Sequence, residues 1–595
     1  MTVIPSDIPI DVPTAKTPAT SWLSRLTVEQ LIYALLALIP LAIRLVDLGL
    51  RPLSPVEAST ALRAWQISRG LEPALDAGIP LLLSLDVATF FLTGAADGLV
   101  RMWPLLASVA IVIALYQWRD WLGRQVALGA AVLVALSPLV NAFGRRGDGA
   151  AFVLLALAIA LAGWGRLAKD DTKGWTWLAV GLGLILISGP AAPTALLALA
   201  IVLLLTWRLA PPLSPIPVTA WVTFLAVTLL GGTIFLTHLN GLGLMALNWS
   251  EWLTAFSLAP VSWLWGLLRL LLDEPLIVLL GLAGIALLAR RSVRASSKNS
   301  ETAWAFGIAA LVVALVAILQ GPYAAGSRVI AALMFAVPAA AFLLWLFRRL
   351  VKPPPDIGGI EGGKRFNAEM ILYMIVFAAL IILGVLALIS YSHTGQLTHL
   401  WLLGATIVMA LVLSLVFLFF LGWRNVLSLA MLVLVAALAL FNIATAAGLA
   451  YDASPPRFPA LYETDARPGV SDLVITAGDV SMRKHGYPWA LPMALVTGSE
   501  ADDLLQWYLR QSPELQLVEH VGLENAPPLV VAPADRALPL SERYAGQDFA
   551  ILDAWDPAQG DLLQQITWAL FRVAPRNIPT ENHILWADTL ILSLE

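Results

Sequence analysis

Long apolar stretches recur from residue 28 to residue 450, and they restrict the fold more than any other feature of this chain. An α-helix needs about 20 such residues to cross a bilayer. Because the stretches are too long and too apolar for the alternating strands of a membrane barrel, only helices can satisfy their backbone in lipid. The sequence predicts a polytopic α-helical membrane protein with about 13 spans, at 28–48, 99–117, 123–142, 149–168, 174–190, 191–208, 217–238, 260–289, 303–320, 328–347, 368–391, 399–421 and 425–450.

Two segments do not follow this simple pattern. Residues 79–93 are apolar but short, so we expect a re-entrant or interfacial segment there. The run 260–289 is interrupted by Asp273, Glu274 and Pro275 in its middle.

Charge divides the chain into two parts. Residues 451–595 carry 9 basic and 20 acidic residues, a net charge of −11, whereas residues 1–450 carry 27 basic and 20 acidic residues, a net charge of +7. We therefore expect a disordered N-terminus (1–27), a transmembrane domain (28–450) and a soluble acidic tail (451–595). In the tail, runs at 472–477, 515–520, 528–533 and 548–555 suggest strands, and 501–510 and 561–571 suggest helices, which predicts a small α/β domain.

The positive-inside rule orients the chain. It places the N-terminus in the cytoplasm, the tail outside, and the whole protein in the plasma membrane. Against that rule, seven arginines fall at outer helix ends or in outer loops, namely Arg44, Arg51, Arg63, Arg69, Arg101, Arg145 and Arg146. Such a cluster suggests an anionic ligand such as phosphate. The alternative is that these arginines snorkel and pair with nearby acids such as Asp47, Glu57, Asp97 and Asp148.

Residues 51–70 raise the question of what Glu57 does among arginines. Ser54, Pro55 and Glu57 match the N-cap, N1 and N3 positions of a capping box, so a helix should span 55–69. Its apolar positions share one face, which predicts an amphipathic helix lying on the outer leaflet. Glu57 can simply close this helix. It can also act as a general base or hold a cation at the membrane surface.

The segment 144–149, Gly-Arg-Arg-Gly-Asp-Gly, is the second candidate site. Its glycines permit a tight turn between two spans, and Asp148 can cap the helix that follows. Arg145 and Arg146 beside a helix N-terminus would suit a phosphate. The alternative is an ordinary polar turn.

The order of these features resembles the GT-C superfamily of membrane glycosyltransferases. The segments 78–106 and 121–148 carry the resemblance, and the protein O-mannosyltransferase and lipid A aminoarabinose transferase group is the nearest broad relative. A narrower resemblance, to the prokaryotic flippase-activity-associated group, rests on 267–285, 504–520 and 583–595.

The resemblance implies an inverting transferase that takes a sugar from a polyprenyl-phosphate donor on the outer face, with an unknown glycan, lipid or protein as acceptor. It further implies that Glu57 is the catalytic base and that Arg145, Arg146, Arg63 and Arg101 hold the donor phosphate, with Asp148 in support. The family's first loop usually reads Asp-Glu, where this chain has Val56-Glu57. Glu57 alone, Asp76 or Asp86 can fill the role, or the chain is a non-catalytic relative.

Other classes of function have less support. There is no cysteine, and the six histidines lack metal-ligand spacing, so a metal is possible but not indicated and no cofactor is expected beyond the donor. Nothing points to nucleic acid. A transporter or flippase of lipid-linked sugar is an alternative. Burial of Asp273 and Glu274 in the bilayer would support it. Trp507, Trp568 and Trp586 are expected in the core of the tail.

Overall fold

A computed structural model describes residues 27–589 of the chain, apart from 77, 212–213, 291–296, 322–323, 352–367, 452–464, 523–525 and 554–579. The predicted N-terminal segment 1–27 (apart from Thr27), the predicted helix 561–571 and Trp568 therefore lie outside the described residues.

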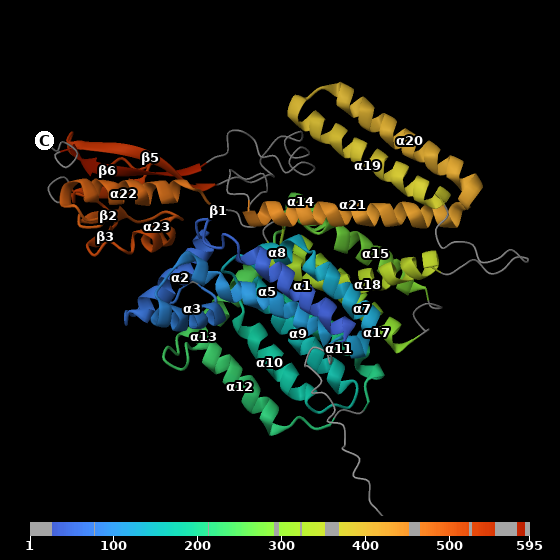
Figure 1. Ribbon diagram of the computed structural model, residues 1–595. Coiled ribbons are helices and arrows are strands. Elements are labelled where there is room, and N and C mark those ends of the chain that lie inside the picture. Colours follow the sequence, from blue (N-terminus) through green and yellow to red (C-terminus); the bar gives the residue numbers. More distant parts are fainter. Residues whose placement is uncertain are drawn as a thin grey trace, which may run out of the picture.

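The described chain is a bundle of apolar helices followed by a small domain built on one sheet (Figure 1). Nine described helices are long and apolar enough to cross a membrane, namely Val28–Leu45, Asp97–Leu122, Ala150–Leu167, Ala192–Leu209, Lys298–Leu319, Ala325–Arg349, Ala368–Tyr391, Leu397–Leu421 and Trp423–Gly448. Four shorter apolar helices accompany them, at Pro80–Thr93, Arg124–Ala135, Gly174–Ile187 and Val218–Gly232. The polytopic helical class is confirmed. Among the described residues nine helices are long enough to be spans, or ten if the bent pair Ser262–Asp273 and Pro275–Ala289 is one span.

The individual elements of the bundle follow the chain in order. They are α1 (Val28–Leu45), α2 (Pro55–Ser68), α3 (Pro80–Thr93), α4 (Asp97–Val100), α5 (Met102–Tyr116), α6 (Arg119–Leu122), α7 (Arg124–Ala135), α8 (Pro138–Phe143), α9 (Ala150–Leu167), α10 (Gly174–Ile187), α11 (Ala192–Thr206), α12 (Val218–Gly232), α13 (Gly241–Thr254), α14 (Pro260–Asp273), α15 (Pro275–Ala289), α17 (Lys298–Leu319), α18 (Ala325–Val351), α19 (Ala368–Thr394), α20 (Leu397–Leu421) and α21 (Trp423–Tyr451). The hairpin of α19 and α20 lies beside α21, apart from the main bundle (Figure 1).

The interrupted run 260–289 is two helices, α14 and α15, which meet at 98°. Pro275 opens α15, and Glu274 before it takes a non-helical conformation, because a residue that precedes proline avoids the α region. Asp273 and Glu274 are both buried at this break. Asp273 lies 3.3 Å from Arg269 and 3.4 Å from Arg328, and Glu274 accepts hydrogen bonds from the hydroxyl of Ser137 and from the backbone N–H of Leu139.

The tail domain, residues 465–588, has a six-stranded mixed sheet in the order β1-β5-β6-β4-β2-β3. Its elements are β1 (Asp465–Ala466), α22 (Gly469–His485), β2 (Met493–Val496), α23 (Asp502–Leu509), β3 (Leu515–Val518), β4 (Leu529–Pro533), β5 (Tyr544–Asp553) and β6 (Thr580–Asp588). β2 pairs in parallel with β3 and with β4, and the other described pairs are antiparallel. The predicted strands at 515–520, 528–533 and 548–555 are confirmed.

The strand predicted at 472–477 is wrong, because these residues lie within the helix α22. Val470, Leu473 and Ala477 are the positions that this helix buries, at a spacing of three to four residues. That is the period of an amphipathic helix. Residues 472–477 alone are too few to distinguish this period from that of a strand.

The tail and the first loop of the bundle share one hydrophobic core. Leu62 of α2 and Phe90 of α3 belong to the same buried cluster as Leu473 and Trp507 of the tail. The rings of Phe90 and Trp507 are 5.8 Å apart. The core position predicted for Trp507 is confirmed, since this side chain is fully buried. α2 packs between α3 and α23, and its predicted position on the outer leaflet stays a prediction.

Candidate functional site

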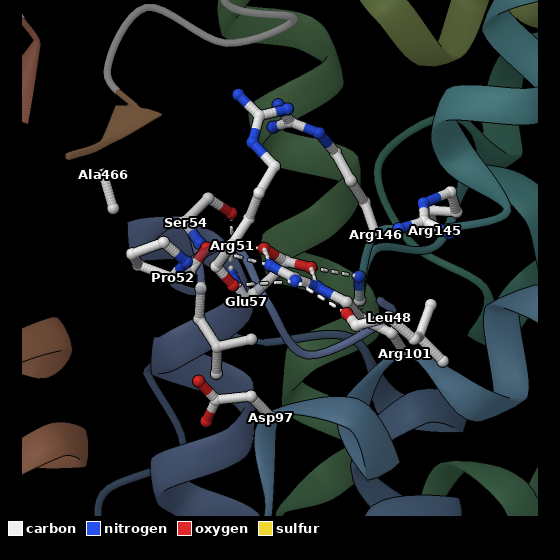
Figure 2. A network of polar contacts seen from close by, with 12 residues as sticks. Leu48, Arg51, Pro52, Ser54, Glu57, Asp97, Arg101, Arg145, Arg146 and Ala466 are labelled. Atoms are coloured by element: carbon white, nitrogen blue, oxygen red, sulfur yellow. Dashed lines mark hydrogen bonds and ion pairs between the residues drawn. The ribbon is translucent and has the colours of Figure 1, made fainter. Parts of the chain in front are cut away.

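Glu57 lies at the start of α2, where Ser54 closes the predicted capping box. Its carboxylate is only 1% exposed and accepts four hydrogen bonds. Oε1 accepts from Nε of Arg101 at 2.9 Å and from the backbone N–H of Gly147 at 2.5 Å. Oε2 accepts from Nη2 of Arg101 at 3.0 Å and from the backbone N–H of Ser54 at 2.8 Å. Every favourable direction around the carboxylate is therefore occupied by the protein (Figure 2).

This environment determines the charge of Glu57. Burial alone would raise the pKa of Glu57, but the Arg101 guanidinium and the hydrogen bonds lower it to about 2. A general base works best with a pKa near the working pH and with an oxygen facing its substrate. Neither condition holds for Glu57, so its contacts suit a structural role better than the catalytic role that the sequence suggested.

Arg101 is held as completely as Glu57. Besides the carboxylate, its guanidinium donates to the backbone carbonyl oxygens of Leu48 at 3.0 Å, Arg51 at 2.9 Å and Pro52 at 2.9 Å. It is 5% exposed. Arg101 thus fastens the loop between α1 and α2 to the start of the next span (Figure 2).

Arg145 and Arg146 bind other parts of the protein. Arg145 donates to the carbonyl oxygens of Val46 at 2.7 Å and Asp47 at 3.1 Å, and its guanidinium carbon lies 4.6 Å from the ring centre of Tyr451. Arg146 pairs with Asp465 of the tail domain at 2.8 Å. Both arginines line a cleft of about 20 Å³, which in this conformation has room for about one water molecule.

Arg63, the fourth predicted phosphate ligand, also bridges to the tail. It pairs with Asp76 at 2.5 Å and with Asp503 at 2.8 Å. Asp76 is therefore engaged by an arginine. Asp86, the other acid considered, is fully buried on α3, and its carboxylate has no hydrogen-bond partner among the described residues.

The turn at 144–149 has the predicted form, with α8 ending at Phe143 and α9 beginning at Ala150. Asp148 accepts a hydrogen bond from the backbone N–H of Ala150 at 2.9 Å. Gly149 packs so closely that a Cβ atom there would lie 1.8 Å from the carbonyl oxygen of Ser188. Asp148 thus bonds the first N–H of α9, but the N-cap position belongs to Gly149 and α9 has no side-chain cap, so the predicted cap is wrong in this respect. Asp148 also lines a much larger cavity.

That cavity has a volume of about 500 Å³, within the range of small-molecule sites. It lies where α2, α9, α11, α13 and α18 begin or end, at the end of the bundle that carries the tail. The described residues that line it include two acids and no lysine or arginine: Val56, Ser59, Gly78, Ile79, Phe143, Asp148, Gly149, Ala150, Ser188, Pro190, Ala191, Asn248, Glu251, Trp252, Ala255, Gln320, Ala324, Ala325, Gly326 and Ser327.

Val56 and Glu57 face opposite ways. Val56 is 42% exposed and lines the large cavity, whereas Glu57 points toward Arg101 and the small cleft. Position 56, where the resemblance led us to expect an acid, therefore presents an apolar side chain to the cavity.

Hydrogen bonds among buried side chains fix one wall of the cavity. The indole N–H of Trp252 donates to Thr194 at 2.8 Å, and the hydroxyls of Thr194 and Ser327 are 2.9 Å apart. Ser327 donates to Gln320 at 2.6 Å, and Gln320 donates back to the carbonyl oxygen of Trp252 at 3.2 Å. This ring of contacts joins α11, α13, α17 and α18, so the wall is preorganised.

Sequence reasoning did not identify this cavity or Glu251 within it. One signal was present: Glu251 is the only charged residue between His238 and Arg269, so its placement in an apolar stretch needed an explanation. Among the described residues, no group of three or more His, Asp or Glu side chains is placed to hold a metal ion.

No family model and no curated protein matches the sequence. Solved structures do match the fold. The structure of ArnT from Cupriavidus metallidurans bound to undecaprenyl phosphate aligns with a TM-score of 0.50 and 16% identity, over 87% of this chain and 94% of that one. The same protein in the apo state aligns with a TM-score of 0.49 and 15% identity, over 85% and 93%. The Archaeoglobus fulgidus oligosaccharyltransferase in the apo form aligns with a TM-score of 0.44 and 14% identity, over 83% and 65%. The chain thus shares the fold of the ArnT structure bound to undecaprenyl phosphate, with a sheet domain at its C-terminal end.

Proposed function

We propose that this protein is a membrane glycosyltransferase that takes a sugar from a polyprenyl-phosphate donor and transfers it, with inversion, to an acceptor on the outer face of the plasma membrane. The main support is the cavity of about 500 Å³ in a fold similar to that of an ArnT structure that contains undecaprenyl phosphate. In the proposed orientation, the N-terminus is cytoplasmic and the tail is extracytoplasmic, because this arrangement gathers most of the lysines of the membrane body inside.

The cavity suits a sugar. Its polar lining consists of hydroxyl, amide and carboxylate groups, which accept and donate hydrogen bonds to a polyol. Trp252 adds an aromatic surface that its bond to Thr194 holds in place. The sugar acceptor is proposed to enter from the same end, where the tail lies.

We place the donor phosphate at the first turns of α11 and α18 instead of at the arginines. Ala191 and Gly326 line the cavity at these helix starts, and a Cβ atom on Gly326 would lie 2.8 Å from that of Ala191. The positive end of a helix attracts an anion. On α11 the N–H of Ala192 already donates to Gly189 and Pro193 has no N–H, so α18 supplies the larger share of this attraction. The four predicted phosphate arginines instead bind loops of the bundle and residues of the tail domain.

The test is turnover of a panel of polyprenyl-phosphate sugars by the protein in lipid nanodiscs, with native lipids and glycans as acceptors. Val56→Trp fills the cavity from α2, and Val408→Trp makes the same change on α20, where the side chain is 58% exposed. We expect donor consumption and binding by the wild type and by Val408→Trp, with a loss of at least tenfold in Val56→Trp. Equal turnover in both variants would remove this cavity from the reaction, and no binding of any donor by the wild type would refute the proposed function.

One observation favours a second candidate. Asp273 and Glu274 are buried in the protein at the break between α14 and α15, and charged sites at broken helices are common in transporters, which counts toward a flippase of lipid-linked sugar. Both acids are engaged by neighbouring groups, Asp273 by two arginines. Movement of a labelled donor across a vesicle membrane without sugar transfer would establish this alternative.

A further inference from the structure

Glu251 lies on α13, a helix with three distinct sides. Gly241, Leu244 and Asn248 form the buried side, and Glu251 projects beside them toward the large cavity. Leu242, Trp249 and Leu253 are exposed and share a neighbouring stripe at i, i+7 and i+11. An apolar stripe with a tryptophan is typical of a helix that lies in the membrane interface. In this position α13 presents Glu251 at the border between lipid and cavity.

The carboxylate of Glu251 is not used by the fold. Among the described residues, it has neither a hydrogen bond nor an ion pair. Asp148, the other acid in the cavity, accepts a bond from Ala150 at the start of α9, and Glu57 outside the cavity accepts four. Of the two acids that line the cavity, Glu251, an exposed residue, is thus the one whose carboxylate oxygens no described residue occupies.

Asn248 supports the same assignment independently. It lies one turn before Glu251, lines the same cavity and is 4% exposed. Its side-chain nitrogen has no hydrogen-bond partner among the described residues, which is a cost unless a ligand or water accepts from it. A donor and an acceptor one turn apart on the same helix match the hydroxyl groups of a polyol.

We propose that Glu251 is the catalytic base of the transfer, an inference that rests on the proposed function. Val56, which faces the same cavity from the first loop, carries no carboxylate that could do this. Glu251 takes the proton from the acceptor hydroxyl as its oxygen forms a bond to the anomeric carbon. The bond from that carbon to the phosphate oxygen breaks, and its electron pair leaves with the polyprenyl phosphate. The proton then passes from Glu251 to solvent.

The electrostatics of Glu251 agree with this role. Glu251 is an exposed residue, but partial desolvation by the protein around it raises the pKa of its carboxyl above the ordinary value, whereas the surroundings of Glu57 lower the pKa of that carboxyl to about 2. A higher pKa makes a carboxylate the stronger proton acceptor at neutral pH.

The experiment compares three variants for turnover and, separately, for binding of the labelled donor. Glu251→Gln removes the base and keeps the shape, Glu251→Asp keeps a carboxylate, and Glu72→Gln makes the control change at an exposed position. We expect Glu251→Gln to lose at least 100-fold in turnover, as the removal of a general base does. Its donor binding should stay within about threefold, Glu251→Asp should retain measurable turnover, and Glu72→Gln should match the wild type.

The outcomes separate the two proposals. Turnover by Glu251→Gln within tenfold of the wild type would overturn the role of Glu251 and leave the glycosyltransferase proposal standing. A wild type that binds the donors but consumes none of them would overturn both, and would favour a non-catalytic binder of lipid-linked sugar.

Discussion

Replacing Glu57 by glutamine separates a structural from a catalytic role most directly. A glutamine presents one acceptor oxygen and one NH₂ group, whereas the site offers four N–H donors to the two oxygens of Glu57. The NH₂ group would face two donors without an acceptor between them. Arg101 would remain buried with its charge uncompensated.

The size of the effect follows from the pKa and from this burial. Lowering the pKa of Glu57 from 4.5 to about 2 corresponds to about 3 kcal/mol of stability at neutral pH, at 1.36 kcal/mol per pH unit. Since the folded-state pKa is the lower one, this stability is present above pH 4.5 and is lost as the pH falls toward 2. Removing one partner of a buried pair costs about 3–5 kcal/mol, in agreement with that value.

The assay is equilibrium unfolding in mixed detergent micelles at pH 7, with Glu72→Gln as the control for the same chemical change at an exposed position. We expect Glu57→Gln to lower the free energy of unfolding by about 3–5 kcal/mol and the control to leave it unchanged. A Glu57→Gln protein with wild-type stability and donor binding, but without turnover, would refute this reasoning. It would make Glu57 the base.

Two further predictions concern packing and the contact with the tail. Asp97 accepts hydrogen bonds from the side chains of Trp507 and Tyr508 of α23. Asp97→Leu should therefore raise the rate of amide hydrogen exchange in α23 relative to the wild type. Equal exchange rates would show that this contact does not stabilise α23. Gly149→Ala should lower the thermal midpoint because its Cβ would meet Ser188, whereas Gly404→Ala, with nothing within 4 Å of an added Cβ, should leave the midpoint unchanged. Equal midpoints for the two alanine variants would show that α9 shifts freely at its start.

Local signals in the sequence predicted the elements well. The capping box at Ser54 and Glu57, the turn before Ala150 and three strands of the tail follow from patterns within a few residues. The error at 472–477 arose where a run of six residues suits a strand and a helix equally.

The partners of the charged residues depend on contacts distant in sequence. Arg146 and Asp465 are 319 residues apart, and Arg63 and Asp503 are 440 residues apart. The sequence showed that the arginines were unusual for an outer surface but did not show that the tail supplies acids to pair with them. The cavity was missed for the same reason, because its described lining comes from the ends of many helices that are distant in sequence.

α2 takes part in two surfaces at once, since Val56 and Ser59 line the cavity while the other side of the helix packs against α23. A molecule that fills the cavity and a molecule that binds the tail therefore act on the position of the same rigid helix. If tail binding strengthens donor binding by some factor, the donor must strengthen tail binding by the same factor, because such coupling free energies are reciprocal. Under such coupling, a molecule that binds the tail would change the occupancy of the cavity without touching it.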